Sequence, residues 1–416
     1  MKIMQIIRRF NFEEWGGTEN VVWSCSRELI RLGDEVEILA TKALGGAERE
    51  IIDGVPIRRF NYFYPYFPLS KAIRRTLDKK GGNPICLGME KYLRDNDFDI
   101  IHTNNAGRLA ELSARVSEKK SVPMVLSLHG GRFDVPEAEK RELMKPLRHT
   151  LRYGGAIERL LGLRRDDLAC ADGIICVGAN EEAGLQARYP DKLVRFIPNG
   201  VDPEKFERPS QYDWRNHLGL HPREKLILNV SRIDYQKNQK QLVRLLARLR
   251  DRGDAAHLLM VGPVTSEWYG RELAELITEL GLETKVTLVP GFPPEDDRLV
   301  AAYQQADVFI QPSLHEPFGI VALEAWCAGT PLLAARVGGL RYLVNDGKTG
   351  LMFDPGDDES LLAAYDRLPS VAERLREQAR AEACAHYSWQ AVTAKLRCFY
   401  EEVIETRLRR DADKEK

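Results

Sequence analysis

Short apolar runs alternate with amphipathic helical patterns along almost the whole chain, and this alternation limits the folds that it can adopt. Residues 2–8 (KIMQIIR) are typical of a buried strand, the stretch after Gly16 and Gly17 of an amphipathic helix, and residues 35–41 (EVEILAT) of a second strand. A strand, a helix and a strand in this order form a βαβ unit, which builds parallel sheets through right-handed crossovers. Further strand-like runs follow at 99–103, 124–129, 173–178 and 194–197. The pattern predicts an α/β protein with doubly wound sheets.

A second series of the same kind begins near residue 225. Its strand-like runs are KLILNVS, HLLMVG, KVTLV, DVFIQPS and PLLAA. A chain of 416 residues is longer than one core usually serves, so two domains of about 200 residues each are expected. The segment 198–212 is rich in turn-forming residues and marks the boundary. We predict an N-terminal domain at 1–200, a C-terminal domain at 201–386, and a helix within 387–416 that crosses back to the first domain before a frayed tail.

The composition indicates a globular chain without a membrane span. Hydrophobic residues make up 44% of the sequence and charged residues 30%, with a formal net charge of −1. No apolar run reaches the length of about 18 residues that a transmembrane helix needs, and the N-terminus is charged too early for a signal peptide. Seven cysteines are scattered without a C-x-x-C pair, which favours a reducing compartment and argues against structural zinc. We therefore expect a cytoplasmic protein.

The stretch HEPFGIVALEA, residues 315–325, marks the start of a helix in the second domain. A strand is expected before it and a glycine stop after it, at Gly329. The backbone amides of Gly319, Ile320 and Val321 then have no partner within the helix and point outward at its amino end. Such amides bind a phosphate well, because the helix dipole adds to their hydrogen bonds. The stretch therefore predicts an anion site.

Two glutamates eight positions apart flank this anion site. Glu324 lies about one turn into the helix, within reach of a diol such as that of a ribose. Glu316 precedes the turn, on the side where a sugar would lie. Two hydrogen-bond acceptors on either side of one phosphate suit a nucleotide diphosphate sugar. The alternative is structural: Glu324 would pair with a buried arginine, and Glu316 would be a surface charge of a loop.

Two cations follow the first strand of the second series. Arg232 stands at the end of the run LILNV, and Lys237 stands close to the start of the next helix. Since ligands of doubly wound sheets bind at the carboxyl ends of the strands, both side chains can converge on a diphosphate. Two fixed cations would neutralise a departing diphosphate without a metal ion. Taken singly, each is more often a partner in a surface salt bridge.

The first domain offers a weaker signal. Gly16 and Gly17 follow the first strand and open a helix, and glycines let a backbone approach a ligand closely. The pair alone is also compatible with a simple turn, because the fingerprint G-x-G-x-x-G is absent. The sequence also lacks a P-loop motif and the zinc motif H-E-x-x-H, since residue 319 is glycine. These absences argue against a P-loop enzyme and a zinc protease.

Together these motifs resemble those of the retaining GT-B glycosyltransferases of glycosyltransferase family four. The most specific match is E-x7-E, here Glu316 to Glu324, within PSLHEPFGIVALEAWCAGTP. Supporting matches, spread over nearly the whole chain, are Pro198 to Asp202, Arg232 with Lys237, Gly262-Pro263 and Gly338-Gly339. The resemblance implies a GT-B fold, with two doubly wound Rossmann-like domains facing a deep cleft and a C-terminal helix that crosses back to the N-terminal domain.

The resemblance also implies roles for individual residues. The catalytic residues would be His129, which lines the pocket near the sugar, Arg232 and Lys237 on the diphosphate, and Glu316 on hydroxyls of the donor sugar. The residues expected to bind the donor are Gly16, Gly17, Gly262, Phe292, Gly319, Ile320, Val321 and Glu324. Among these, Phe292 would flank the base and Glu324 would bind the ribose.

On the acceptor side, Asn104 stands at the second histidine of the family's His-x-His. Arg132, from its place just after His129-Gly130-Gly131, can meet an acceptor phosphate, and a surface salt bridge is the alternative. Two further departures are Ser231 and Asn238, which replace glycines beside the arginine and the lysine. Asparagine tolerates the left-handed conformation, so the second change is expected to be harmless.

By resemblance, the chain would be a metal-independent, retaining hexosyltransferase with no cofactor beyond its co-substrate. Its partners would be a nucleotide diphosphate sugar and a sugar, sugar-phosphate or lipid-linked acceptor, and it would bind no nucleic acid. A nucleotide-sugar epimerase of the same fold and a non-catalytic nucleotide-sugar binding protein are the alternatives, although the second could dispense with Arg232 and Lys237. A dinucleotide oxidoreductase is disfavoured, because the strand 35–41 ends without an acidic residue for a ribose.

The N-terminal domain also carries candidates for a membrane contact. The stretch 61–68 (NYFYPYFP) is followed by Lys71, Arg74 and Arg75, and the stretch 140–165 mixes basic residues with leucines. Aromatic rings at the interface and cations over anionic headgroups would suit peripheral binding at the inner face of a membrane. The alternative is that the aromatic residues pack into the core and the basic helix covers a neighbouring subunit. The sequence leaves the base, the sugar, the acceptor and the oligomeric state open.

Overall fold

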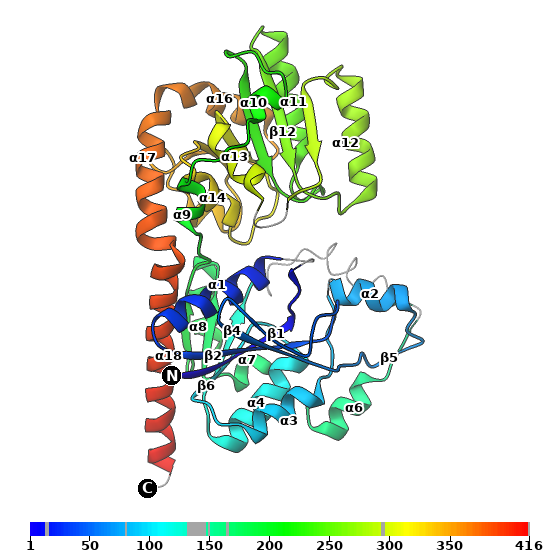
Figure 1. The fold of residues 1–416 in the computed structure, drawn as a ribbon, viewed down its shortest axis with the longest axis vertical. Coiled ribbons are helices and arrows are strands. Elements are labelled where there is room, and N and C mark those ends of the chain that lie inside the picture. Colours follow the sequence, from blue (N-terminus) through cyan, green and yellow to red (C-terminus); the bar gives the residue numbers. More distant parts are fainter. Residues whose placement is uncertain are drawn as a thin grey trace. The chain divides into compact units, whose positions relative to one another are not determined.

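The computed structural model describes residues 1–12, 16–79, 81–130, 147–148, 150–163, 166–292 and 296–414. The chain divides into two compact units, of which the first comprises Met1–Pro198 with Val392–Lys416 and the second Asn199–Ala391. The sequence analysis placed these borders at 200/201 and 386/387. Each unit is an α/β body with its own sheet, as the alternation of apolar runs predicts (Figure 1).

The sheet of the first unit has eight strands in the order β10-β9-β7-β6-β1-β2-β4-β3. The strands are β1 (Lys2–Arg9), β2 (Glu35–Thr41), β3 (Arg49–Ile52), β4 (Val55–Phe60), β6 (Ile100–Thr103), β7 (Met124–Leu128), β9 (Gly173–Cys176) and β10 (Leu193–Phe196). All neighbours pair in parallel except β3 and β4, which form an antiparallel hairpin. This hairpin was not predicted from the sequence, because burial alternates along both strands and neither contains a long apolar run.

Helices cover both faces of this sheet. They are α1 (Gly17–Arg31), α2 (Lys71–Lys79), α3 (Leu87–Asp95), α4 (Arg108–Lys120), α6 (Gly154–Leu161), α7 (Asp167–Cys170) and α8 (Ala179–Arg188). Met4 and Ile6 belong to the core that includes α3 and α4, whereas Ile7 and Ile38 belong to the core that includes α1. Since successive side chains of a strand point to opposite faces, the central strands supply both cores. A separate two-stranded sheet joins β5 (Tyr66–Phe67) to β8 (Leu151–Arg152).

The sheet of the second unit has six parallel strands in the order β13-β12-β11-β14-β15-β16. The strands are β11 (Lys225–Val230), β12 (Ala256–Val261), β13 (Val286–Val289), β14 (Val308–Gln311), β15 (Leu332–Ala335) and β16 (Leu351–Phe353). The helices are α9 (Pro203–Glu207), α10 (Trp214–His217), α11 (Gln239–Asp251), α12 (Glu267–Glu279), α13 (Asp297–Gln305), α14 (Ile320–Cys327), α15 (Leu340–Leu343), α16 (Asp358–Arg367) and α17 (Ala372–Glu382). The first five strands coincide with the five apolar runs read from the sequence.

The last helix, α18 (Trp389–Lys414), begins in the second unit and continues in the first. It is held to the first unit by the buried rings of Phe399 and Tyr400 and by an ion pair from Arg397 to Asp34 at 2.9 Å. The predicted crossover helix is therefore present. Residues 411–414 of the predicted tail continue this helix, and the predicted fraying remains a prediction. Among the described helices, none has the length and apolar character that a bilayer crossing requires.

Candidate functional site

In the second sheet, the predicted site residues gather where two neighbouring strands are followed by crossovers in opposite directions. The chain leaves β11 toward β12 on one side, while β14 lies on the other side of β11. In doubly wound sheets, ligands bind at such a switch point, outside the carboxyl ends of the strands. The loop after β11 carries Arg232 and Lys237, and the loop after β14 carries Glu316.

Lys237 and Glu316 contact each other. The ammonium of Lys237 donates to Oε2 of Glu316 at 2.7 Å, and the amide of Gln311 donates to the same oxygen at 2.7 Å. Glu316 is only 8% exposed, so the alternative of a surface loop charge is wrong. A carboxylate this deeply placed needs such partners, because an unpaired buried charge is strongly destabilising. Two residues that the sequence assigned to different parts of a donor are thus joined in the ligand-free chain.

Arg232 remains largely open to solvent. Its side chain is 42% exposed, and its ion pair with the buried Asp234 is long, at 3.4 Å. Asp234 shapes the turn, since its Oδ1 accepts hydrogen bonds from the amides of Gln236 and Lys237. Asn238, just before α11, has a φ of 53°, which confirms that asparagine takes the left-handed conformation there. The turn therefore presents Arg232 and directs Lys237 to the switch point.

The amino end of α14 offers the backbone donors that the sequence predicts. Gly319 precedes the helix with a φ of 102°, and no side chain caps it. The amide of Ala322 bonds to the Gly319 carbonyl at 2.9 Å. Within the described part of the chain, the amides of Gly319, Ile320 and Val321 meet no protein acceptor. They are available to an anion, which a helix start favours.

The glycine pair Gly338-Gly339 supports the loop that carries Glu316. The amide of Gly339 donates to the Glu316 carbonyl at 2.8 Å. A Cβ atom on Gly338 would lie 2.2 Å from the carbonyl oxygen of Glu316, and one on Gly339 would lie 2.2 Å from that of Pro317. Only glycine lets the two backbones approach so closely, which gives this motif a structural reason.

Glu324 has a tyrosine partner in place of the buried arginine considered from the sequence. The hydroxyl of Tyr303, in α13, donates to Oε2 of Glu324 at 2.7 Å. Burial raises the pKa of the Glu324 carboxyl, and this hydrogen bond acts in the opposite direction. The bond fixes one carboxylate oxygen about one turn into α14, as a ribose-binding residue requires.

Gly262 and Phe292 lie beyond the ends of β12 and β13. Gly262 has a φ of 149°, and a Cβ atom there would meet the carbonyl oxygen of Ser231 at 2.0 Å. Its Cα lies 3.7 Å from the position of a Cβ on Gly291. The ring of Phe292 contacts Trp214, with centroids 6.0 Å apart, and Arg298, whose guanidinium lies 4.6 Å from the ring centroid. The roles predicted for both residues beside a base remain predictions.

In the first unit, the corresponding switch point lies between β1 and β6. The guanidinium of Arg8 donates to the carbonyls of Leu77 and Asp78, at 3.0 and 2.6 Å, and so binds the end of α2. The backbone amide of Arg8 donates to Oδ1 of Asn105, which follows β6, at 2.6 Å. Burial lowers the pKa of Arg8. Arg8 of β1 therefore ties the end of α2 to the segment after β6 at this edge of the sheet.

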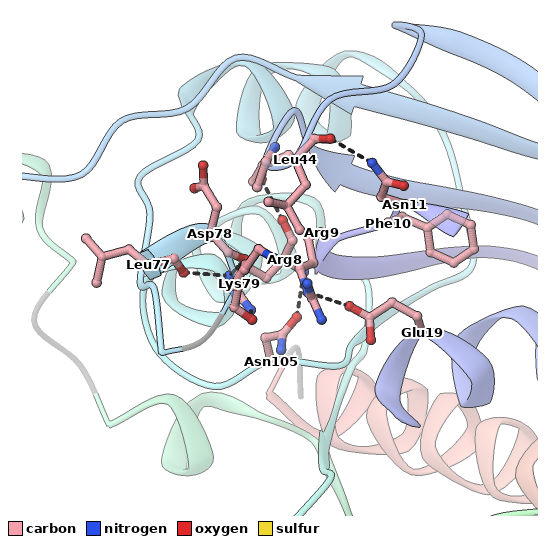
Figure 2. A network of polar contacts seen from close by, with 12 residues as sticks. Arg8, Arg9, Phe10, Asn11, Glu19, Leu44, Leu77, Asp78, Lys79 and Asn105 are labelled. Atoms are coloured by element: carbon pink, nitrogen blue, oxygen red, sulfur yellow. Dashed lines mark hydrogen bonds and ion pairs between the residues drawn. The ribbon is translucent and has the colours of Figure 1, made fainter. Parts of the chain in front are cut away.

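Gly16 has a structural role in the same region. Arg9 forms an ion pair with Glu19 of α1 at 2.7 Å (Figure 2), and a Cβ atom on Gly16 would lie 2.7 Å from the other oxygen of Glu19. The glycine leaves room for this carboxylate beside the start of α1, where Gly17 is the first helical residue. The predicted contact of Gly16 and Gly17 with a donor remains a prediction.

His129 and Asn104 meet at the carboxyl ends of β7 and β6. Nε2 of His129 lies 2.9 Å from Oδ1 of Asn104. Burial lowers the pKa of His129 to about 4, so the ring is neutral at neutral pH. Behind this pair lie further polar side chains that the sequence analysis did not select. The sequence does contain a signal for them, which is a polar residue within an otherwise apolar strand. Examples are Gln5 in KIMQIIRR and Ser127 in MVLSL.

The proposed membrane stretches divide between core and surface. Tyr64 and Leu147 are buried together in a small core, as the packing alternative expected. Phe67 and Leu151 face each other across β5 and β8 and are 65% and 73% exposed, and Leu160 in α6 is 85% exposed. Arg132 and residues 140–146, with 149 and 164–165, lie outside the described residues. In the part of the chain that is described, no cluster of three or more His, Cys, Asp or Glu side chains could hold a metal.

Two family models match the chain. The model described as "Glycosyltransferase Family 4" matches residues 15–205, and the model described as "Glycosyl transferases group 1" matches residues 210–383. A D-inositol 3-phosphate glycosyltransferase from Nocardia farcinica is 38% identical over 401 residues, which cover 90% of this chain and 82% of the relative. A glycosyltransferase from Methanocaldococcus jannaschii is 27% identical over 97% of this chain and 99% of its own.

Solved structures share the fold over both units. Sucrose-phosphate synthase from Thermosynechococcus elongatus has a TM-score of 0.70 at 24% identity and covers 98% of this chain and 100% of its own. HepE from Anabaena, solved in complex with UDP and glucose, has a TM-score of 0.70 at 19% identity and covers 97% of this chain and 100% of its own.

Proposed function

The chain belongs to the glycosyltransferases of family four and has their GT-B fold with two Rossmann-like domains, and from this premise we propose that it transfers a hexose from a nucleotide diphosphate sugar to an acceptor hydroxyl with retention of configuration. The observation that carries the proposal is the switch point of the second sheet. There the unpaired amides of α14 lie beside the loop of Glu316, and Lys237 is directed to the same carboxylate.

In this proposal, the diphosphate is bound by the amides at the start of α14, by Lys237 and by Arg232. Among the residues that the structure describes, the guanidinium of Arg232 forms one long ion pair, with Asp234 at 3.4 Å, and is therefore available. These donors and cations stabilise the negative charge that develops on the departing diphosphate, and such electrostatic stabilisation is often the largest catalytic effect. No divalent ion is required for that charge.

The reaction would proceed at one face of the sugar. The bond from the anomeric carbon to the phosphate oxygen breaks, and the acceptor oxygen bonds to the same face of that carbon. The departing phosphate takes the proton of the acceptor hydroxyl. Glu316 would bind hydroxyls of the transferred sugar, and Glu324 those of the ribose. Phe292 and Gly262 would flank the base.

For the acceptor, we propose a phosphorylated sugar or polyol. The support is the identity of 38% to relatives named D-inositol 3-phosphate glycosyltransferases, which extends over 90% of the chain. Arg132 would bind this acceptor, whereas the amide of Asn104, predicted for the same role, is buried and bonded to Gln5 and His129.

A panel of nucleotide diphosphate sugars tests the proposed function. The cognate donor should raise the melting temperature by mass action, and it should support transfer to a sugar phosphate with an unchanged anomeric configuration. Arg232→Ala and Lys237→Ala should each lower kcat at least about a hundredfold. Matched controls are Arg252→Ala and Lys240→Ala, since both residues form ion pairs elsewhere on the same unit. Near-normal turnover in both test variants would refute the leaving-group role.

We also propose a peripheral contact of the first unit with anionic membranes. Phe67, Leu151 and Leu160 expose apolar side chains, and Lys71, Arg74 and Arg75 follow close in sequence. Apolar anchors with neighbouring cations suit an anionic lipid surface. The chain should sediment with phosphatidylserine vesicles at low salt and lose this binding as Phe67→Ser/Leu151→Ser. Ile51→Ser, an exposed change on β3, should bind as the original chain does. Absence of sedimentation at low salt would exclude the contact.

A further inference from the structure

A chain of buried polar side chains connects α18 to His129. Gln5 of β1 and His102 of β6 are register partners, and Asn104 lies two residues after His102. Because side chains alternate along a strand, these residues share one face of the sheet. Tyr400 of α18 covers that face, with its hydroxyl 3.0 Å from Nε2 of Gln5 and 2.5 Å from Nδ1 of His102. We call Ser127, His102, Tyr400, Gln5 and Asn104 the Tyr400 relay, and it ends at His129.

Backbone carbonyls fix the direction of the hydrogen bonds at one end. Nδ2 of Asn104 faces the carbonyl oxygens of Ile6 and His102, at 3.4 and 3.5 Å, and Oε1 of Gln5 at 2.8 Å. Carbonyl oxygens only accept, so the amide nitrogen of Asn104 must be on this side. Its Oδ1 therefore faces His129, and Nε2 of His129 must carry the proton of that hydrogen bond.

The hydrogen-bond directions from Gln5 to Ser127 are assigned from the orientation of Asn104. Since Oε1 of Gln5 accepts from Asn104, its Nε2 donates to the Tyr400 oxygen. Tyr400 has one proton, which then goes to Nδ1 of His102. Nε2 of His102 consequently carries a proton and donates to Ser127 at 2.6 Å. In this arrangement, every contact of the relay pairs one donor with one acceptor.

The relay determines what His129 can offer a ligand. With its proton on Nε2, the ring presents a lone pair on Nδ1. Nδ1 is buried and has no hydrogen-bond partner among the described residues. A buried acceptor without a partner is costly in a folded protein and is commonly satisfied by a ligand or water. A sugar hydroxyl has the matching chemistry, because it can donate to this nitrogen.

We propose that Asn104, oriented by the backbone carbonyls of Ile6 and His102, is a positioning residue that keeps His129 in the Nε2–H tautomer, so that its Nδ1 accepts a hydrogen bond from a sugar hydroxyl of a substrate. This proposal adds a positioning residue to the proposed transferase function, and the identity of the ligand as a sugar substrate rests on that function. The tautomer of His129 follows from the relay alone. Tyr400, in the middle of the relay, comes from α18.

Nitrogen-15 NMR of the full chain, labelled at its eight histidines, tests the tautomer directly. The His129 signals are assigned by their loss in His129→Gln. We expect a proton on Nε2 and none on Nδ1 in the original chain. Asn104→Leu removes the acceptor of the Nε2 proton, so part of His129 should move its proton to Nδ1. Tyr400→Phe should keep the tautomer, because the carbonyls of Ile6 and His102 still orient the Asn104 amide. A proton on Nδ1 in the original chain, or an unchanged tautomer in Asn104→Leu, would overturn the proposal.

Two substitutions at Asn104 separate positioning from packing. Asn104→Asp still accepts from Nε2 of His129 and should keep the tautomer, whereas Asn104→Leu cannot accept and should lose it. We expect kcat to fall about tenfold or more in Asn104→Leu, with the donor KM nearly unchanged. Tyr92→Phe is the matched control, because its hydroxyl bonds to Glu37 outside the relay. Equal loss of kcat in Asn104→Asp and Asn104→Leu would contradict the positioning role.

Addition of substrates to the labelled chain identifies the source of the hydroxyl. A shift of the Nδ1 signal with the nucleotide sugar alone assigns the hydroxyl to the donor, and a shift that needs the sugar phosphate assigns it to the acceptor. No shift with either would refute the ligand contact. Since the tautomer is measured without turnover, a chain that lacks transferase activity would contradict the proposed function and leave the relay in place.

Discussion

Tyr303 acts on the candidate site through one hydrogen bond, from its hydroxyl to Oε2 of Glu324 at 2.7 Å. Tyr303→Phe removes this donor and leaves the ring in place. The pKa of Glu324, already raised by burial, should rise further, because the lost bond lowered it. We expect the donor KM to rise about tenfold and kcat to stay nearly unchanged, since a ribose contact is remote from the reacting carbon.

Steady-state kinetics with the cognate nucleotide sugar measure this prediction. Tyr365→Phe serves as the control, because it removes a phenol from the same unit, in α16, without a bond to Glu324. A fall in kcat with an unchanged donor KM would place Glu324 at the reaction centre and contradict its assignment to the ribose.

For single residues, the sequence predicts the place of a side chain relative to a helix or strand better than it predicts the hydrogen-bond partners of that side chain. The spacing of Glu316 and Glu324 correctly placed one glutamate before a helix start and the other one turn inside it. It did not show that Gln311 and Lys237 converge on Glu316, or that the partner of Glu324 is Tyr303. These contacts join residues from different strands and helices, and periodicity along one segment carries no information on them.

At the scale of the elements, a substitution in the loop after β15 tests whether the loop that carries Glu316 must pack closely against it. Gly339 has a φ of −64° and a ψ of −26°, which alanine adopts without strain. A Cβ atom there would nevertheless lie 2.2 Å from the carbonyl oxygen of Pro317 and 2.8 Å from Cα of Phe318. Gly339→Ala should lower the free energy of unfolding of the second unit by about 2 kcal/mol and displace the loop of Glu316, so that donor affinity falls.

Gly184→Ala is the matched control. Gly184 lies in α8, and a Cβ atom there would meet nothing within 4 Å. The same substitution should stabilise the first unit by about 0.5–1 kcal/mol, since alanine favours a helix over glycine. Chemical denaturation and donor titration measure both variants. Donor affinity equal to that of the original chain in Gly339→Ala would show that the two loops need not touch.

Helices and strands were predicted correctly where the apolar pattern of a single segment is enough to identify the element. The five apolar runs from residue 225 onward became β11 to β15, because strands buried on both faces are apolar throughout. The β3–β4 hairpin was missed, since its alternating pattern is weak over so few residues. The relay was missed for a different reason, because its members come from three strands and from α18, nearly 400 residues apart in sequence at the extremes.

For the molecule as a whole, Glu111 predicts how stability depends on pH. Burial, together with Glu158 and Asp167, raises the pKa of this α4 carboxyl to about 7, and its Oε2 has no partner among the described residues. The folded chain thus retains a proton that the unfolded chain loses between pH 4.5 and 7. The free energy of unfolding therefore falls as the pH rises through this window. Glu111→Gln should stabilise the chain by about 1 kcal/mol at pH 8 and by nothing at pH 4.

Urea unfolding of both chains at pH 4, 6 and 8 measures this difference. The buried histidines act in the opposite direction, since the lowered pKa values of His102 and His129, about 3 and about 4, make the unfolding free energy fall as the pH drops below 6.5. The comparison of Glu111→Gln with the original chain cancels their contribution. A gain that is equal at pH 4 and pH 8 would contradict the raised pKa.

The central claim is that a diphosphate binds at the start of α14 with Lys237 and Arg232. Calorimetric titration of the nucleoside monophosphate and diphosphate of the cognate base tests it most directly, because the two ligands differ by one phosphate. We predict that the original chain binds the diphosphate about a hundredfold more tightly, that Lys237→Ala and Arg232→Ala lose most of this preference, and that Lys240→Ala keeps it. An equal preference for the diphosphate in all four chains would contradict the account.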